Sequence, residues 1–351
     1  MKIVFCWSAI SGYMAACWKE MARRPEIDVH VIAHGSASGS SFHSNLLHGL
    51  SHRLLSQREQ DDAIAIEGLV AEQKADVVVT TGWWLAPYRN LVHSSKLAGT
   101  KFIMGVDSPW RHEAQFLTRL RYGTSIRKFD HFFVTGERSW QYVTRLGVPP
   151  NKISRGMYGV DVAAWTKVAS RRSTSPWPRQ FVFLGRYERV KAVDVLVEAY
   201  RQYRQRVSDP WSLICCGTGP DRDLLAGADG IIDRGFVQPV DLQDVLADSG
   251  AFVMPSRFDP WPLALVEAAA TGLPVVCTDA CGSAVEVVRP YYNGLMVPKE
   301  SPAALAAAMM TIHERVDDLA QWGQRSIELA SPYATEFWAD RWVTACRRLT
   351  A

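Results

Sequence analysis

Short runs of β-branched and aromatic residues alternate with segments of helical periodicity along most of the chain. In the first half these runs are KIVFCW, DVHVIAH, DVVVTTG, KFIMGVD and HFFVTG. The alternation restarts beyond residue 180 with FVFLGR, SLICCGTG, IIDRGFV, AFVMPS and PVVCTD. Strands that alternate with helices in this way predict mostly parallel sheets wrapped by helices.

The alternation lapses between residues 161 and 180, where the sequence is polar and contains prolines. This composition is typical of a linker. With 351 residues the chain also exceeds the roughly 250–300 at which one core stops growing. We therefore expect two α/β domains, 1–165 and 175–334, joined near residue 170. Their ligands would bind outside the carboxyl ends of the strands, in a cleft between the two domains.

Composition narrows the class of protein. An apolar content of 48% with 21% charged residues is typical of a globular chain. A net charge of only +3 argues against a dedicated nucleic-acid surface. Seven cysteines without a framework spacing favour a reducing compartment such as the cytoplasm, and their spacing predicts no metal site.

The first residues allow two interpretations. Lys2 and the apolar residues after it imitate a signal peptide that ends at a lipoprotein-like Cys17. A strand over residues 3–7, a loop at Gly12 and a following helix explain the same letters. We favour the second interpretation because Ser8 and Gly12 interrupt the apolar run, and no other run has transmembrane length.

The stretch from Trp110 to Phe129 is basic as well as apolar. Its cations are Arg111, Arg119, Arg121, Arg127 and Lys128. As a helix it could rest on anionic lipid headgroups at an inner membrane face. The plainer alternative, which we favour, is a solvated helix packed on its own domain.

The segment GRYERVKAVDVLVEAY begins at Gly185 and has no Gly-rich dinucleotide or Walker lysine motif before it. Its periodicity puts Lys191 at or just before the amino end of a helix, where the macrodipole disfavours a cation. A phosphate held there by Arg186, Lys191 and backbone N–H groups would remove this conflict. Alternatively, Arg186 pairs with Glu188 or Asp194. Lys191 would then face water.

The segment RFDPWPLALVEAAATGLPVVCTD begins at Arg257 and places two carboxylates near an apolar helix. Pro262 suits the start of this helix and Gly272 its end. Asp259 and Glu267 are too far apart to share a proton, because eight helical residues span about 12 Å. We expect them to contact different parts of one elongated ligand. Alternatively, Glu267 only stabilises the first turn of its own helix.

A nucleotide sugar has the required shape. Its diphosphate needs cations and a helix terminus, which Arg186, Lys191 and the helix after them would supply. Its ribose and sugar hydroxyls each need a carboxylate acceptor. Glu267 and Asp259 would supply these two acceptors.

The order of these motifs resembles a known family. GRYERVKAVDVLVEAY, CCGTGPDRDLL, RGFV, PSRFDPWPLALVEAAATGLPVVCTD and CGSAVEVVRPYYNGLMVP are similar to the consecutive carboxy-domain motifs of retaining family 4 glycosyltransferases (glycosyl transferases group 1). DHFFVTGERSWQYVTRLGVPPNKISRGMYGVD is similar to the segment that ends their amino domain. The resemblance implies the GT-B fold, two Rossmann-like α/β domains with mostly parallel sheets facing an interdomain cleft. The first domain would bind the acceptor and the second the donor, and we expect the helix at 335–351 to pack back on the first.

The resemblance also implies roles for single residues. Arg186 and Lys191 would hold the donor diphosphate, and Glu267 the ribose. Phe236 and Val237 would flank the nucleobase. The catalytic candidates are Asp259, Asp107, Arg186 and Lys191. The other donor-binding candidates are Gly12, Gly185, Gly235, Trp261, Pro262, Leu263 and Glu286, with Gly12 allowing close approach of its loop to the phosphates.

The chain departs from the family at three places. Asp259 stands where the family usually has a glutamate, and its shorter side chain leaves the position or identity of the donor sugar open. Trp261 and Pro262 replace a common Phe-Gly step, and the proline removes one backbone donor. Asp107 follows a strand after which the family often has a histidine near the acceptor. Asp107 either replaces this histidine or only caps the turn that follows.

The implied reaction moves a sugar from a nucleoside-diphosphate sugar to a hydroxyl of a glycan, lipid or small-molecule acceptor. It would retain the anomeric configuration and need no metal or other cofactor, since Arg186, Lys191 and a helix terminus would stabilise the departing diphosphate. Two rivals remain. A nucleotide-sugar epimerase shares this two-domain build, and a catalytically silent nucleotide-sugar binder would fit the departures at Asp259 and Pro262 and the missing histidine.

Overall fold

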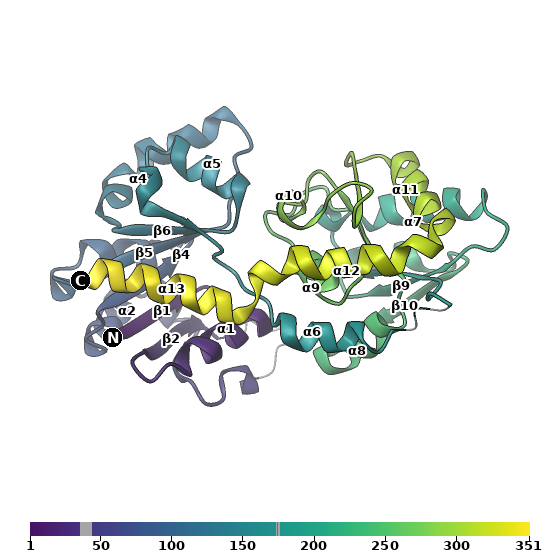
Figure 1. Cartoon of the computed structure of the whole chain (residues 1–351). Helices are drawn as coiled ribbons and strands as arrows, with labels where there is room; N and C mark the ends of the chain where they lie inside the picture. Colours follow the sequence, from purple (N-terminus) through teal and green to yellow (C-terminus); the bar gives the residue numbers. More distant parts are fainter. Residues whose placement is uncertain (36–43, 173, 175) are drawn as a thin grey trace. The chain divides into compact units, whose positions relative to one another are not determined.

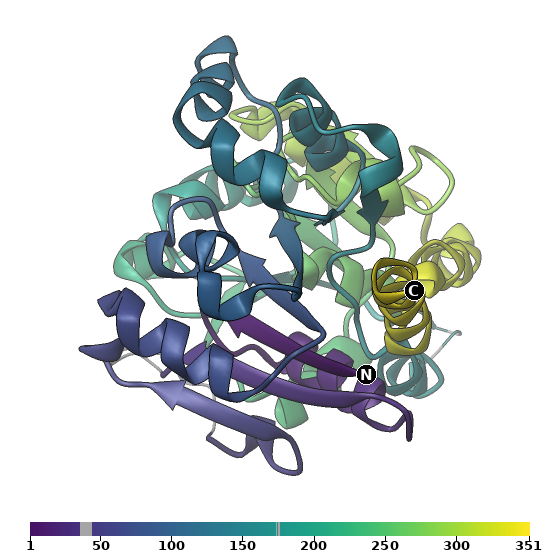
Figure 2. The same cartoon turned by 90° about the vertical axis from the view of Figure 1, so that its left-hand side faces the viewer.

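The computed structural model describes residues 1–35, 44–172, 174 and 176–351. The chain forms two compact units, one from Met1–Asp161 with Tyr333–Ala351 and one from Val162–Pro332 (Figure 1). The chain thus returns to the first unit with its last helix, α13 (Thr335–Thr350), which is yellow in Figure 1 and Figure 2.

The first unit is built on a seven-stranded sheet in the order β3-β2-β1-β4-β5-β6-β7, and every pairing is parallel. Its strands are β1 (Lys2–Trp7), β2 (Asp28–His34), β3 (Ser51–Leu55), β4 (Val77–Thr81), β5 (Lys101–Val106), β6 (His131–Val134) and β7 (Ile153–Arg155). Its other helices are α1 (Gly12–Ala22), α2 (Ala63–Glu72), α3 (Ala86–Asn90), α4 (Leu117–Lys128) and α5 (Glu137–Arg145). The beginning of the chain therefore has the strand, loop and helix of the favoured interpretation.

Helix α13 joins the first unit through aromatic packing. The ring of Trp342 stacks on that of Phe133 in β6, with centroids 3.7 Å apart. Trp338 is fully buried, and its indole N–H donates to the backbone oxygen of Met157 at 2.8 Å. Large aromatic groups bury 150–250 Å² each, as a rough guide. This apolar contact explains why the last helix belongs to this core.

The second unit contains a six-stranded parallel sheet in the order β10-β9-β8-β11-β12-β13. Its strands are β8 (Gln180–Leu184), β9 (Ser212–Cys216), β10 (Ile231–Gly235), β11 (Ala251–Met254), β12 (Val275–Thr278) and β13 (Gly294–Val297). Its helices are α6 (Val162–Ala169), α7 (Val193–Arg204), α8 (Pro239–Ala247), α9 (Leu263–Ala270), α10 (Ala284–Val287), α11 (Pro302–Glu314) and α12 (Leu319–Ala330). The predicted parallel α/β architecture is confirmed in both units.

Helix α6 occupies the first half of the segment expected to be a linker, so that expectation was wrong for residues 162–169. Val162 and Val168 of this helix are buried. The buried Arg172 just beyond it donates to the backbone oxygens of Leu246, Ser249 and Thr271. A helix with so short an apolar face is hard to recognise among polar residues.

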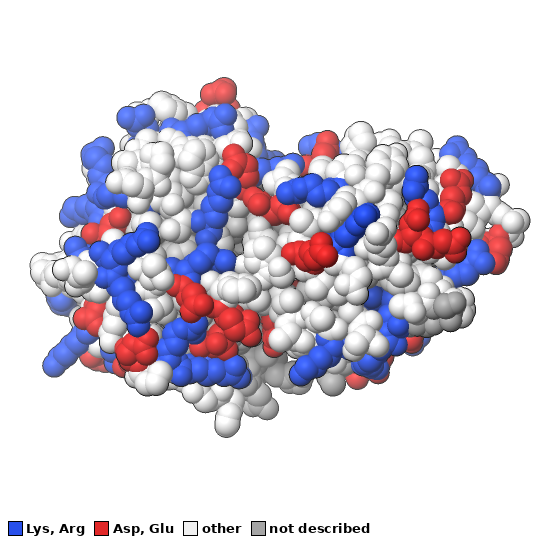
Figure 3. All heavy atoms as spheres, viewed as in Figure 1, with Lys and Arg blue, Asp and Glu red and all other residues white. Residues whose placement is uncertain are grey.

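Charges of both signs are interspersed over the face of the molecule in Figure 3, as the small net charge suggests. None of the helices in the described ranges combines the length and the apolar character needed to cross a membrane.

Candidate functional site

The donor-site candidates of the second unit lie in the segments that follow its strands. Gly185 and Arg186 follow β8, and Gly235 ends β10. The segment from Asp259 to Leu263 connects β11 to α9, and Glu286 lies in α10 after β12. In a parallel sheet these segments share the carboxyl edge. The structure therefore brings residues that are about 100 positions apart in the sequence to one edge.

Lys191 and Asp259 form an ion pair at this edge. Lys191 ends a short 3-10 helix, η7 (Arg189–Lys191), two residues before α7. Its ammonium donates to Oδ2 of Asp259, and the two side chains are only 16% and 10% exposed. Lys191 therefore does not face water, and each buried charge has the other as its partner. Sequence reasoning named both residues but did not predict that they meet.

Arg257 fixes the segment that carries Lys191. Its Nη1 and Nη2 donate to the two carboxylate oxygens of Asp194 at 2.8 and 2.6 Å, and its Nε to Glu300 at 2.6 Å. These carboxylates raise the pKa of Arg257 above its usual range. Nη1 also donates to the backbone oxygen of Arg189 at 2.8 Å. The η7 turn is thus bound to the segment after β11. Sequence reasoning missed this role, although Arg257 opens the motif that contains Asp259.

Arg186 forms an ion pair with Glu188, which is the alternative to phosphate binding that the sequence left open. Its Nη1 donates to Oε1 of Glu188 at 2.9 Å, and its side chain is 72% exposed. Asp194, the other expected partner, is bound to Arg257 instead. Because an exposed ion pair of this kind contributes about 0–1 kcal/mol, an anionic ligand could draw Arg186 away from Glu188.

Glu267 lies near the middle of α9. It is the fifth residue of the helix, beyond the first turn, so the alternative that it stabilises that turn was wrong. Its carboxylate accepts no hydrogen bond from any residue that the structure describes, and the residue is half-buried. Burial raises the pKa of Glu267 to about 7. A desolvated carboxylate without donors is unfavourable, which indicates a place for donors supplied from outside the protein.

The loop between β12 and α10 supports Asp259 from behind. The N–H of Asp259 donates to Ala280, and its backbone oxygen accepts from Gly282 at 2.8 Å. A Cβ on Gly282 would come within 1.7 Å of the backbone oxygen of Pro260, so only glycine fits there. The hydroxyl of Ser283 donates to the backbone oxygen of Pro262, the N-cap of α9. Trp261 beside it is buried.

The loops after β8 and β9 are in close contact. A Cβ on Gly217 would lie 1.9 Å from the backbone oxygen of Gly185, and one on Gly219 would lie 2.2 Å from that of Tyr187. Next to β10, Phe236 and Val237 line a hollow of about 430 Å³. Phe236 is exposed, as a residue that contacts a nucleobase would have to be.

The two candidates in the first unit lie after β1 and β5. Gly12 begins α1, and a Cβ there would meet nothing within 4 Å, so no part of the described protein requires glycine at this position. Asp107 follows β5 and accepts a hydrogen bond from the hydroxyl of Tyr158 at 3.3 Å. Burial raises the pKa of Tyr158, which keeps this hydroxyl protonated as a donor.

Asp107 lines a small pocket of about 100 Å³ at the carboxyl edge of the first sheet. Aromatic side chains form its walls, namely Trp7, Trp84 and Tyr158. The pocket also contains Thr81, whose buried hydroxyl has no hydrogen-bond partner among the described residues. Aromatic faces next to hydroxyl and carboxylate groups suit an uncharged, hydroxyl-bearing ligand.

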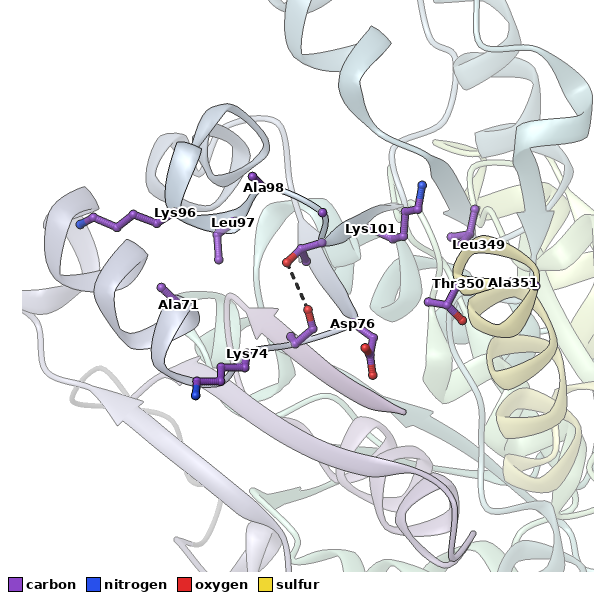
Figure 4. A pocket seen from close by; sticks show the side chains of 13 residues that line it. Ala71, Lys74, Asp76, Lys96, Leu97, Ala98, Lys101, Leu349, Thr350 and Ala351 are labelled. Carbon is purple, nitrogen blue, oxygen red and sulfur yellow. Dashed lines mark hydrogen bonds between the residues drawn. The ribbon is translucent and has the colours of Figure 1, made fainter.

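A larger hollow of about 700 Å³ lies at the opposite edge of the same sheet, near the start of β5 (Figure 4). Its cations are Lys74, Lys96 and Lys101, which point in different directions in Figure 4. Lys96 and Lys101 pair with Glu67 and Asp130. The hollow therefore lacks convergent charges and is separate from the candidate site. Within the described ranges, no three His, Cys, Asp or Glu residues gather as a metal site.

Comparison with known proteins identifies the class. Residues 178–315 match the family model described as glycosyl transferases group 1. The D-inositol 3-phosphate glycosyltransferase of Rhodococcus jostii is 27% identical over 234 residues. That match covers 62% of this chain and 52% of the relative, so the chain spans about half the length of this curated relative.

Solved structures resemble the whole chain. A glycosyltransferase from Rickettsia africae has a TM-score of 0.78 at 15% identity, covering 99% of this chain and 98% of the other. HepE from Anabaena in complex with UDP has a TM-score of 0.76 at 15% identity, covering 99% and 100%. These likenesses confirm the GT-B fold that the sequence resemblance implied.

Proposed function

We propose that the protein is a retaining glycosyltransferase that moves a sugar from a nucleoside-diphosphate sugar to an acceptor hydroxyl. The observation that carries this proposal is the combination, at one sheet edge, of the Lys191–Asp259 pair with Glu267, which has no hydrogen-bond partner among the described residues. This edge lies within residues 178–315, which match the glycosyltransferase model. The UDP in the HepE complex supports a nucleotide donor.

In this proposal donor binding separates Lys191 from Asp259, and each of the two side chains then contacts the donor. Lys191 turns from Asp259 to the diphosphate, which also contacts Arg186 and the amino end of α7. Asp259 is then able to accept a hydrogen bond from a hydroxyl of the donor sugar. Glu267 accepts hydrogen bonds from the ribose hydroxyls, and these stabilise its charged form. The nucleobase lies against Phe236 and Val237.

Bond cleavage places negative charge on the diphosphate and positive charge on the sugar ring. Lys191 and Arg186 stabilise the first, and preorganised charges of this kind are usually the largest contribution to catalysis. The carboxylate of Asp259 lies on the side of the sugar ring, where the positive charge develops. The leaving phosphate assists deprotonation of the acceptor, which attacks the face that the diphosphate leaves, so the configuration is retained.

The first unit would select the acceptor, with Asp107 and its aromatic pocket as the contact for an acceptor hydroxyl. An acceptor that is a glycan, a lipid-linked sugar or a small polyol fits the chemistry of this pocket. The seven cysteines are all free and buried, which favours a reducing compartment, the cytoplasm.

A thermal-shift screen of UDP, GDP and ADP sugars tests the proposal, because a ligand that binds only the folded state raises the melting temperature. We expect one nucleotide class to stabilise the protein and Arg186→Ala to abolish the shift. Arg201→Ala is a matched control, since Arg201 is also exposed and paired with a glutamate, Glu198. An unchanged shift in Arg186→Ala would count against the assigned phosphate site.

Product analysis separates the rivals. A glycosyltransferase needs an acceptor to consume the donor, whereas an epimerase converts the donor alone. Binding without turnover across a broad panel of acceptors would favour a silent binder.

A further inference from the structure

The first turn of α4 and the short helix before it, η5 (Glu113–Phe116), expose large apolar side chains. Phe116, Leu117 and Leu120 are 43%, 60% and 74% exposed. The residues that α4 buries are Gly123, Ser125 and Ile126. A helix on the surface of a soluble domain normally shows the reverse arrangement, with its leucines toward the core.

The charged residues of the same helix are all basic. Its sequence, LTRLRYGTSIRK, contains no aspartate or glutamate. Its cations are Arg119, Arg121, Arg127 and Lys128, and none of them forms an ion pair with a carboxylate in the part of the chain that the structure describes. Arg119 lies over the ring of Phe116, and Arg121 over that of Tyr122.

Helical spacing puts both kinds of side chain on one face. Leu120, Arg121, Thr124 and Lys128 follow Leu117 at intervals of three, four, seven and eleven residues, and all five are exposed. Residues at these intervals share one side of a helix. In Figure 3 the region of α4 and α5 shows an uncharged area with mostly blue and a few red side chains at its margin.

Residues next to α4 add further pairs of arginine and aromatic side chains. Arg145 lies over the ring of Trp110 at 4.9 Å, and Arg89 over that of Tyr122 at 4.5 Å. Tryptophan and tyrosine next to arginine are the side chains that occupy the boundary between lipid tails and water. We call the group Phe116, Leu117, Arg119, Leu120, Arg121, Arg127 and Lys128 the α4 surface.

We propose that the α4 surface docks on an anionic lipid bilayer. The two leucines and the phenylalanine enter the region below the headgroups, while the arginines and Lys128 contact lipid phosphates. A bilayer fits better than a folded protein partner, because every charged side chain of α4 is a cation and Glu113 of η5 is the acidic residue that precedes them. Helix α4 would then lie in the plane of the interface, with Gly123 and Ile126 still packed on the sheet.

Binding of the full chain to vesicles tests this proposal. We expect the protein to sediment with vesicles of phosphatidylcholine that contain about one third phosphatidylglycerol, and not with phosphatidylcholine alone. Raising the salt concentration to about 0.5 M should release it, because screening weakens the attraction. Equal binding to both vesicles, or no binding to either, would overturn the proposal, even if the same surface captured an acidic protein.

Three variants locate the contact. Leu120→Ser should weaken binding about ten-fold through lost apolar burial. Arg121→Gln should weaken it about five-fold, the usual effect of one basic residue near an anionic surface. Ile64→Ser is the matched control, because Ile64 on α2 is 78% exposed but has no comparable basic surroundings, and it should leave binding unchanged. A loss in the control equal to that in Leu120→Ser would contradict the assignment.

The proposal does not depend on the donor site, which lies in the other unit. Melting temperatures of the variants without ligand show that each is folded. Their thermal shift with the nucleotide sugar should match that of the unaltered chain. Failure to bind vesicles with a normal nucleotide shift would reject the α4 surface alone, whereas vesicle binding without any nucleotide shift would reject the proposed function alone.

Discussion

The carboxyl edges of the two sheets are built from different chemistry. The edge of the second unit has buried charges, with Lys191 paired to Asp259, and with Glu267 lacking a partner in the part of the chain that the structure describes. The edge of the first unit has aromatic walls around a single carboxylate, that of Asp107. Charges fixed in a protein before the ligand arrives suit a diphosphate, whereas aromatic and hydroxyl groups suit an uncharged molecule. Two sheets of one architecture can therefore differ in the chemistry of their binding edges through the residues after their strands.

The largest effect that separates the two edges is expected from Lys191→Ala. It removes the partner of a buried carboxylate, so the second unit should lose about 3–5 kcal/mol of stability. Transfer should fall about 1,000-fold, because a cation beside the leaving group is missing. Urea unfolding and steady-state rates measure the two effects.

The double variant Lys191→Ala with Asp259→Asn controls for the unpaired charge. It should recover part of the stability but none of the activity. Equal stability of Lys191→Ala and the unaltered chain would show that the ion pair is not buried as described.

Asp107→Asn tests the edge of the first unit. It keeps the shape of the side chain but removes its charge, so we expect acceptor-dependent turnover to fall about 10–100-fold, because the charged carboxylate no longer orients the acceptor hydroxyl. The thermal shift with donor should stay the same, since the donor site lies in the second unit. A weaker donor shift would mean that the two edges do not divide the ligands.

The variant Glu267→Gln tests the edge of the second unit through the pH dependence of protein stability. The pKa of about 7 in the folded protein is above the usual 4.5, so the folded state holds a proton that the unfolded state releases. The protonated carboxyl of Glu267 makes its full contribution to the free energy of unfolding below about pH 4.5. This contribution is lost as the pH rises through 7. Glutamine stays neutral, so the variant should melt a few degrees higher than the unaltered chain at pH 8 and equally at pH 4.5.

Donor binding should show the opposite pH dependence at this carboxylate. If ribose hydroxyls donate to charged Glu267, protonation below pH 7 weakens binding, at most ten-fold for each pH unit. Glu267→Gln should bind the donor weakly at every pH. Calorimetric titration at pH 6 and pH 8 measures this, and a pH-independent affinity in the unaltered chain would remove Glu267 from the site.

The smallest effect is expected from Arg257→Lys. Lysine keeps the charge but cannot donate to both oxygens of Asp194 and to Glu300 together. We expect a loss of about 1–2 kcal/mol in unfolding free energy and a modest rise in the KM for the donor, because the η7 turn is less fixed. Arg315→Lys, at an exposed pair with Asp318, should change neither value.

The central strands could be predicted from the sequence, because runs such as IVFCW and VVVTT are buried on both faces and are therefore largely apolar. The sequence was not sufficient for β3 and β7 at the sheet edges, nor for the short β13. The edge strand β3, SHRLL, is mostly exposed and has no apolar run. Helix α6 was missed for a similar reason.

Positions of the site residues were predictable, but their contacts were not. The alternation of strands and helices indicates which residues follow a strand, so Arg186, Lys191 and Asp259 could be placed at one edge. The Lys191–Asp259 pair joins residues 68 positions apart. The role of Arg257 depends on the path of the loop after β11. No local pattern of residues contains this information.

A crystal structure of the chain with the nucleotide sugar that gives the largest thermal shift tests directly whether the Lys191 edge binds the donor diphosphate. We predict that the diphosphate lies against Lys191, Arg186 and the amino end of α7, with Asp259 released to the sugar and Glu267 on the ribose. A donor bound elsewhere, with Lys191 still paired to Asp259 and Arg186 still paired to Glu188, would rule out this edge as the donor site.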